Sequence, residues 1–273
     1  MTPPTSRPPV ALTIAGSDPS GGAGIQADLK TFSALGAYGT SVITALTAQS
    51  TQGVAGTHLV PTEFVTQQLQ TLVADVRIDS VKIGMLATRD LAEAVGAFLR
   101  ERAYPVVVLD PVMVATSGDR LLDADAVEAI RELLPLVALV TPNLEEAADL
   151  LGVHAAADVA GMQDQARRLM AAGAPRVLLK GGHLGDEQDA VDVYAGPEGE
   201  QVLAAPRSRT TSTHGTGCTL SSAITALRPQ RGTWVESVTE AKQWLTGAIA
   251  AAGALDVGHG HGPVHHFYRV WDR

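Results

Sequence analysis

The segment TTSTHGTGCTLSSAITAL (210–227) has the residues best suited to chemistry. Polar residues and two glycines, Gly215 and Gly217, lead directly into an apolar helical pattern. The start of a helix offers unpaired N–H groups and the positive end of its dipole, and both favour an anion. The segment therefore predicts a phosphate cradle formed by Gly215, Thr216, Gly217 and Cys218. An ordinary capped helix fits the local pattern equally well, because Ser, Thr and Gly all begin helices.

Cys218 lies in the first turn of this expected helix. A free thiol has a pKa near ~8.5, and a helix N-terminus can lower it, so a thiolate here could accept a proton from a substrate hydroxyl. The alternative is a buried, inert thiol, which is common for a lone cysteine.

Oxygen ligands for a hard cation occur at Asp110 and in the segment TPNLEE (141–146), which includes Asn143, Glu145 and Glu146. Mg²⁺ at phosphates needs only one or two carboxylates. Alternatively, Asp110 caps a turn before Pro111, and Asn143 and Glu146 form a capping box on the next helix. The His-rich end HGHGPVHH (259–266) could bind zinc or copper. Because no carboxylate or cysteine accompanies its histidines locally, we favour a structural segment.

The elements that must position these residues alternate along the chain. Buried strands are predicted at 10–15, 41–46, 81–85, 106–109, 136–140 and 177–179, and helices at 23–35, 62–76, 90–102, 124–134, 144–151, 158–172, 216–227 and 235–255. This alternation indicates an α/β fold with a mostly parallel sheet covered on both faces. Segments 189–194 and 201–205 flank the turn-rich GPEGE and predict an antiparallel hairpin at one sheet edge. Ligands of such sheets bind beyond the carboxyl ends of the strands, where the polar and glycine-rich segments occur.

Composition limits the classes of function. The 273 residues have a net charge of −9, a pI near 5.3, 45% hydrophobic and 18% charged residues. The acidic balance argues against a nucleic-acid partner, and no apolar run is long enough to suggest a membrane span. The lone cysteine excludes an intramolecular disulfide framework and fits a cytoplasmic protein. Residues 1–9 are predicted to be a disordered tail, and residues 10–273 one domain. The chain lacks the P-loop, GxSxG and HExxH motifs, and Gln49 stands where a dinucleotide enzyme needs an acidic residue.

Eight segments in order resemble a known family. They are AGSDPSGGAGIQADLKT (15–31), ALTAQSTQGV (45–54), KIGML (82–86), DPVMVATSGDRLL (110–122), TPNLEEA (141–147), LLKGGH (178–183), THGTGCTLSSAI (213–224) and GHGPVHHF (260–267). They are similar to the bacterial hydroxymethylpyrimidine and phosphomethylpyrimidine kinases of thiamine biosynthesis, in the ribokinase-like superfamily. The resemblance implies a three-layer αβα fold and two successive transfers from ATP, with Mg²⁺. The first acceptor is 4-amino-5-hydroxymethyl-2-methylpyrimidine and the second is its monophosphate. The resemblance also suggests a cytoplasmic homodimer.

The resemblance assigns roles to residues of this chain. Pyrimidine-binding positions correspond to Gly16, Asp28, Gln49, Met85 and Val112, and the anion hole to Gly215–Cys218. The metal and phosphate region corresponds to Asp110 and Glu146, and the nucleotide phosphates to Lys180, Asn143 and Thr213. The Gln49 amide has a donor and an acceptor, which match an aminopyrimidine edge. We expect 49–56 to fold over the pocket as a flap.

One position departs from the family pattern. Thr116 stands where many relatives have Lys, which would remove a positive charge near the phosphates. Lys82 and Arg120 are candidates to compensate for it. Two other functions stay open on the sequence: a pyridoxal kinase of the same fold, and a non-catalytic pyrimidine sensor.

Overall fold

The computed structural model describes residues 7–113, 126–182, 184, 189–208 and 210–271. The strands are β1 (Val10–Ala15), β2 (Tyr38–Ile43), β3 (Ala45–Ser50), β4 (Gly53–Leu59), β5 (Ser80–Ile83), β6 (Val107–Leu109), β7 (Leu139–Val140), β8 (Val177–Lys180), β9 (Asp189–Gly196) and β10 (Gly199–Pro206). The α-helices are α1 (Gly24–Ala34), α2 (Thr62–Asp75), α3 (Arg89–Glu101), α4 (Ala126–Leu133), α5 (Leu144–Leu151), α6 (Val159–Ala171), α7 (Thr216–Leu227) and α8 (Trp234–Ala250).

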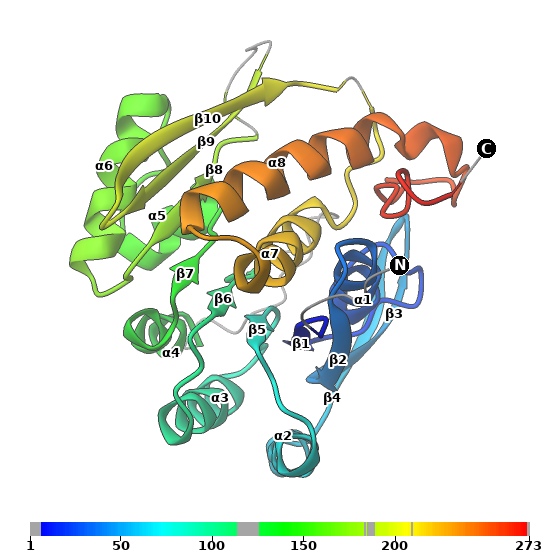
Figure 1. The fold of residues 1–273 in the computed structure, drawn as a ribbon, viewed down its shortest axis with the longest axis vertical. Helices are drawn as coiled ribbons and strands as arrows, with labels where there is room; N and C mark the ends of the chain where they lie inside the picture. Colours follow the sequence, from blue (N-terminus) through cyan, green and yellow to red (C-terminus); the bar gives the residue numbers. More distant parts are fainter. Residues whose placement is uncertain (1–6, 114–125, 183, 185–188, 209, 272–273) are drawn as a thin grey trace.

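Eight strands form one sheet in the order β10-β9-β8-β7-β6-β5-β1-β2 (Figure 1). Pairing is parallel from β2 to β8, and β9 and β10 add an antiparallel hairpin at the edge. The predicted mostly parallel sheet with its edge hairpin is therefore confirmed. Because the parallel strands end at one edge, the loops that follow them meet there.

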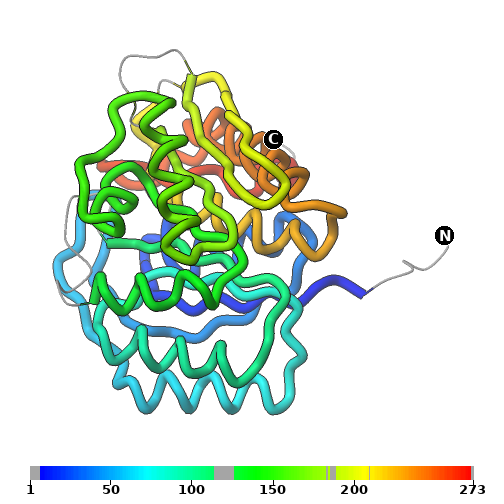
Figure 2. The backbone as a smooth tube through the Cα atoms, turned by 90° about the vertical axis from the view of Figure 1, so that its left-hand side faces the viewer, coloured from blue at the N-terminus to red at the C-terminus, as the bar shows by residue number. Residues whose placement is uncertain are grey.

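Helices cover both faces of the sheet, and successive residues of each strand point to opposite faces, so both sets of side chains are buried. Val107 and Leu109 pack into the cluster that α2 to α6 cover, whereas Val108 packs with residues of α7 and α8 on the other face. Figure 2 shows these layers with α2 and α3 (cyan to teal) on one side of the blue strands and α8 (orange) on the other. The three-layer αβα prediction is confirmed.

The predicted strand 41–46 is wrong, because the chain turns at Thr44. The Thr44 N–H donates to the Ala15 carbonyl at 3.0 Å, and its Oγ1 donates to the Met85 carbonyl at 2.9 Å. These bonds divide the segment into β2, which stays in the large sheet, and β3, which leaves it. Strands β3 and β4 form a separate antiparallel pair that the sequence analysis did not predict. The segment expected as a flap, 49–56, contains the turn of this hairpin.

Two chain ends differ from expectation. The Arg7 guanidinium donates to both Asp79 carboxylate oxygens, at 2.9 and 3.0 Å, so the predicted disordered tail is wrong for residues 7–9. Residues 1–6 lie outside the described residues. Helix α8 ends at Ala250, and a 3₁₀ turn (Ala252–Ala254) replaces the last predicted turn. Within the described part of the chain, no helix is both long and apolar enough to cross a membrane.

Candidate active site

A cavity of about 1110 Å³ lies beyond the carboxyl ends of the parallel strands. Its walls come from loops after β1, β5, β6, β7 and β8, from the β3–β4 hairpin and from the N-terminus of α7. Every sequence-predicted site residue except Asp28 lines this cavity, namely Gly16, Gln49, Met85, Asp110, Val112, Asn143, Glu146, Lys180, Thr213, Gly215, Thr216, Gly217 and Cys218. The sheet topology therefore brings segments from across the chain into one hollow.

Helix α7 begins at the cavity in the way that an anion cradle requires. Its N-cap Gly215 has φ +75°, a left-handed conformation that favours glycine. A Cβ at Gly215 would also clash with the Gly22 carbonyl, so the glycine-rich loop after β1 packs directly against the helix tip. The first intrahelical bond runs from the Thr219 N–H to the Gly215 carbonyl at 2.9 Å. The Thr216 N–H donates to the Thr213 carbonyl at 3.3 Å, whereas Gly217 and Cys218, in the first turn where N–H groups lack intrahelical partners, line the cavity.

Lys180 brings positive charge to the same helix tip. Its Nζ is 2.8 Å from Asp110 Oδ1 and 3.8 Å from Glu146 Oε2. A Cβ built at Gly217 would lie 3.2 Å from Lys180 Nζ, which places the ammonium beside the first turn of α7. Burial opposes the charge on Lys180, but Asp110 and Glu146 outweigh it and raise the pKa of the amine. Lys180 is therefore a fixed cation next to the cradle.

The two carboxylates beside Lys180 differ in their ionisation. Burial opposes the charge of Asp110, but Lys180 and Lys82 outweigh it and hold its pKa below the ordinary value. Burial raises the pKa of Glu146 to about 7, although Lys180 opposes the rise. Asp110 also accepts from Ser221 Oγ at 3.2 Å. The cluster thus combines one firmly charged carboxylate with one that titrates near neutral pH.

Asn143 and Glu146 form the capping box that the sequence offered as their alternative role. The Asn143 side chain accepts from the Glu146 N–H at 2.8 Å, and Glu146 Oε2 accepts from the Asn143 N–H at 2.7 Å. The box fixes the start of α5, and both side chains still line the cavity. Capping and site formation are therefore compatible here.

Asp110 and Glu146 have a donor set that fits a magnesium ion bound to phosphate oxygens. Their carboxylates flank Lys180 on the cavity wall, and Mg²⁺ at phosphates needs one or two such oxygens while keeping several waters. The described residues contain no group of three or more His, Cys, Asp and Glu that could hold a metal by themselves. A phosphate-bound ion suits this donor set better than a resident one.

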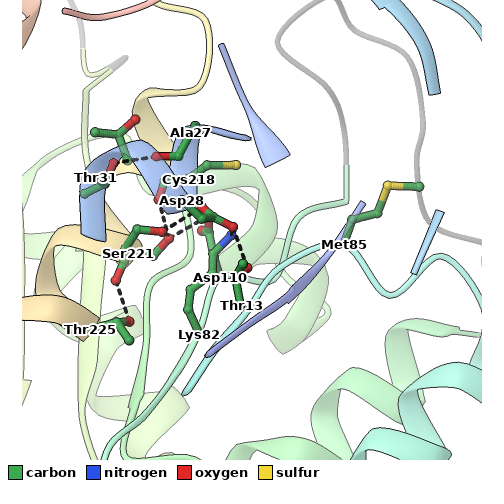
Figure 3. A network of polar contacts seen from close by, with 12 residues as sticks. Thr13, Ala27, Asp28, Thr31, Lys82, Met85, Asp110, Cys218, Ser221 and Thr225 are labelled. Carbon is green, nitrogen blue, oxygen red and sulfur yellow. Dashed lines mark hydrogen bonds and ion pairs between the residues drawn. The ribbon is translucent and has the colours of Figure 1, made fainter. Parts of the chain in front are cut away.

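Asp28 does not face the cavity, which corrects its predicted contact with a pyrimidine. Its carboxylate is fully buried and accepts from Thr13 Oγ1 at 2.6 Å and Lys82 Nζ at 3.0 Å (Figure 3). It also accepts from Ser222 Oγ at 2.6 Å. These partners come from β1, α7 and β5. Asp28 therefore ties three elements together behind the site.

Lys82 is also fully buried, although it contributes to the cavity wall. Because its ammonium is engaged by Asp28, it does not replace the missing lysine as a free phosphate ligand. Thr116, which stands where many relatives have Lys, and Arg120, the other candidate to compensate for it, lie outside the described residues.

Cys218 lies at the cavity wall but not as a ready thiolate. Burial raises the pKa of its thiol to about 11, although the charge of Lys82 opposes the rise. The expectation that the helix N-terminus lowers this pKa is therefore wrong, because the surrounding protein removes water from the sulfur. At neutral pH the free protein holds Cys218 as the thiol.

Another part of the cavity wall is less charged. Met85 is 8% exposed, and a Cβ at Gly16 would lie 3.3 Å from its sulfur, so the loop after β1 packs closely on it. Val112 follows β6, and Gln49 projects from β3. Apolar groups and one side-chain amide thus face the same hollow as the charged helix tip.

Sequence reasoning missed a polar pair at the edge of this wall. His214 Nε2 lies 2.8 Å from Asp18 Oδ2 and 3.5 Å from the Gln49 side-chain nitrogen. Burial opposes the charge of Asp18, but its bonds to His214 and Ser20 outweigh it and lower its pKa to about 2. The only sequence signals were a histidine directly before the GTGC segment and an aspartate in a glycine-rich loop.

The C-terminal strap, residues 258–263, joins two parts of the site. The N–H groups of Gly260 and His261 donate to Thr51 Oγ1 at 3.2 Å and to the Thr51 carbonyl at 2.9 Å. The Gly262 carbonyl accepts from the His214 N–H at 3.1 Å. Part of the His-rich end therefore holds the tip of the β3–β4 hairpin against the loop that precedes α7.

Comparison with known proteins shows the family of this chain. The family model for phosphomethylpyrimidine kinase matches residues 18–265. A hydroxymethylpyrimidine/phosphomethylpyrimidine kinase of Escherichia coli (strain K12) is 57% identical over 262 residues, covering 96% of this chain and 98% of the relative. These matches confirm the resemblance carried by the sequence motifs.

Solved structures match as well. An ADP complex of Bacillus subtilis pyridoxal kinase has a TM-score of 0.88 at 35% identity, covering 97% of this chain and 99% of that chain. A phosphomethylpyrimidine kinase from Clostridium difficile 630 has a TM-score of 0.78 at 39% identity, covering 88% of this chain and 99% of the other.

Proposed function

Because the chain belongs to the phosphomethylpyrimidine kinase family, we propose that it phosphorylates 4-amino-5-hydroxymethyl-2-methylpyrimidine and then its monophosphate. ATP is the phosphoryl donor, and the product is the pyrimidine diphosphate used in thiamine biosynthesis. The observation that carries the proposal is one cavity shared by two unlike walls. Gln49 and Met85 belong to the less charged wall, and Lys180 and the α7 N-terminus form the charged one.

The less charged wall supports recognition of the heterocycle. Gln49 offers one donor and one acceptor to the aminopyrimidine edge. Met85 and Val112 supply apolar contact to the ring faces, and a thioether packs well against an aromatic ring. Gly16 leaves room for this packing, because a side chain there would press on the Met85 sulfur.

The charged wall supports phosphoryl transfer, which depends on positioning and charge neutralisation more than on covalent chemistry. The N–H groups of Gly217 and Cys218 bind the moving phosphoryl group at the positive end of α7. Lys180 neutralises charge beside them, and Thr213 and Asn143, which line the cavity, would contact the nucleotide phosphates. Asp110 and Glu146 would hold Mg²⁺, which when bound neutralises the nucleotide's phosphate oxygens.

We propose that the Cys218 side chain, which lines the cavity, lies beside the acceptor hydroxyl when that group loses its proton. Because its pKa is raised, the thiol contributes mainly through position until bound substrates change its surroundings. In the second transfer the nucleophile is a phosphate oxygen, which is already ionised. We therefore expect Cys218→Ala to lower the first transfer more than the second, and equal losses would reject a role in proton removal.

The family resemblance suggests an oligomeric state, and the use of ATP suggests a cellular location. We propose a homodimer in the cytoplasm, where the ATP that the reaction consumes is available. Gel filtration with light scattering tests the first statement, because a monomer has a mass of 28.3 kDa.

Pyridoxal is the second candidate substrate. It is favoured by the TM-score of 0.88 to a pyridoxal kinase and by the hydroxymethyl group that pyridoxal also has on a nitrogen heteroaromatic ring. ADP release should be measured with Mg²⁺ and ATP on each alcohol separately. A higher kcat/KM for pyridoxal would overturn the substrate assignment. Binding of the pyrimidine without ADP release would leave only a sensor.

A further inference from the structure

His214 is a junction of three segments that are distant in sequence. Its backbone N–H is bonded to Gly262 of the C-terminal strap, and its side chain contacts Asp18 and Gln49. The residue is 5% exposed and Asp18 is 1% exposed. A Cβ at Gly22 would overlap the His214 ring, so the ring packs directly against a glycine backbone. These contacts give the imidazole one position.

The hydrogen-bond donors around Asp18 determine which ring nitrogen of His214 carries a hydrogen. Asp18 accepts from the N–H groups of Ser20 at 2.8 Å and Ala23 at 2.8 Å, and from Gly22 at 3.1 Å. A carboxylate surrounded by donors is an acceptor only. His214 Nε2 must therefore carry a hydrogen, which it donates to Asp18.

This tautomer of His214 bears on which way the oxygen and nitrogen of the Gln49 side-chain amide face. With its Nε2 hydrogen directed at Asp18, His214 cannot accept from the Gln49 amide nitrogen 3.5 Å away, so two N–H groups would face each other there. An amide oxygen at that position would instead be attracted by the positive N–H bond of His214. On the other side, Thr47 has a single hydroxyl hydrogen, and it goes to the Ser17 carbonyl at 2.8 Å. Toward Gln49, at 3.2 Å, Thr47 can then only accept. Thr47 therefore requires the amide nitrogen on its side, and the His214 N–H favours the amide oxygen on the other, so the oxygen and nitrogen of the Gln49 amide exchange places.

The amide order sets the direction of the substrate. In the aminopyrimidine, the ring nitrogen acceptor, the 4-amino donor and the 5-hydroxymethyl group follow one another around the ring. With the amide nitrogen on the Thr47 side, the ring nitrogen lies there and the 4-amino group lies toward His214. The hydroxymethyl group then extends past His214, and the next residue is Gly215 at the tip of α7. The opposite amide order would turn it away from the cradle.

We propose that Asp18 and His214 are positioning residues that hold the Gln49 amide in one orientation and so direct the hydroxymethyl group to the helix tip. This inference rests on the proposed function, because it requires Gln49 to read the pyrimidine. It predicts that loss of the His214 donor leaves binding largely intact and makes bound pyrimidine unproductive.

His214→Leu removes the donor, whereas His214→Gln keeps an N–H that can donate to Asp18. We expect His214→Leu to lower kcat by roughly 100-fold, since misplacement of a substrate by about 1 Å has that effect. The pyrimidine Kd, measured by calorimetry, should change less than about threefold, and His214→Gln should recover most of kcat. The ADP formed per phosphorylated pyrimidine should rise in His214→Leu. His58→Leu, the same change at an exposed position of β4, is the control.

The tautomer can be measured without activity. In the wild-type protein labelled with ¹⁵N-histidine, long-range ¹H–¹⁵N spectra should show His214 protonated at Nε2. A neutral Nδ1–H tautomer would overturn the inference, as would a His214→Leu variant with wild-type kcat and one ADP per product.

Gln49→Ala separates failure of the inference from failure of the proposed function. It should weaken pyrimidine binding roughly tenfold or more. If Gln49→Ala binds the pyrimidine with wild-type affinity, the proposed role of Gln49 in pyrimidine recognition fails, and the inference fails with it. If the wild-type protein does not phosphorylate the pyrimidine, the proposed function fails whatever the tautomer.

Discussion

Alkylation of Cys218 would measure how much thiolate forms at the tip of α7. Cys218 is the one cysteine among the 273 residues, so iodoacetamide incorporation followed by mass spectrometry reports this site without ambiguity. Burial raises its pKa from 9.0 to about 11. At pH 8 the folded protein should therefore hold about 100-fold less thiolate than the same chain unfolded in urea.

The reaction rate should differ by less than the thiolate population. A thiolate of higher pKa is a better nucleophile, and a Brønsted coefficient of about 0.45 makes it roughly eightfold more reactive for this shift. The folded protein should then react about tenfold more slowly than the unfolded chain at pH 8, before any further slowing by restricted access.

The pH profile gives the sharper result. In the folded protein the rate should increase about tenfold per pH unit to beyond pH 10, whereas the unfolded chain should level off near its ordinary pKa. The Cys218→Ser variant is the control for labelling at other residues. A folded-state rate that levels off below pH 8.5 would refute the reasoning, because the helix tip and Lys82 would then outweigh burial.

Three further predictions test the surroundings of the cavity. Lys82→Met should lower the free energy of unfolding by about 3–5 kcal/mol, because it leaves the Asp28 carboxylate buried without its ion partner. Urea titration checks this, and adding Asp28→Asn should recover part of the loss; wild-type stability in the single variant would contradict it. Lys180→Met should lower kcat for both acceptors by roughly 100-fold or more while pyrimidine affinity is kept. Kinetics with calorimetry decide, and a comparable loss of affinity would show that this lysine belongs to the pyrimidine wall. The folded-state pKa of Asp18, about 2, is below its ordinary 3.8, so its contribution of about 2 kcal/mol is present above pH 4 and is lost as the pH falls toward 2. Asp18→Asn should flatten the fall in stability between pH 5 and pH 3, and an unchanged slope would exclude this role.

The sequence predicted the sheet and most of the cavity wall because both depend on local patterns. Apolar runs and helical periods located the strands of the large sheet and its covering helices. Parallel strands end at a common edge, so residues such as Asp110 and Lys180 could be expected to meet although they are far apart in the chain. The turn at Thr44 was missed, because it depends on bonds to Ala15 and Met85 that no local pattern reveals.

Side-chain environments were less predictable. Asp28 lies on a helix whose neighbours turn its carboxylate toward the core, and its residue type gives no sign of this. The pKa of Cys218 depends on burial by distant elements, so a rule about helix ends gave the wrong direction. The contact of Asp18 with His214 joins residues 196 positions apart. Such contacts depend on the completed fold.

The C-terminal strap has a consequence for protein synthesis. Residues 258–263 join the β3–β4 hairpin to the loop before α7, although the hairpin leaves the ribosome about 200 residues earlier. At roughly 5–20 residues per second, that interval lasts about ten seconds or more. A nascent chain should therefore hold an unfinished pocket throughout this time, and catalytic competence should begin only after residues 258–263 have cleared the exit tunnel.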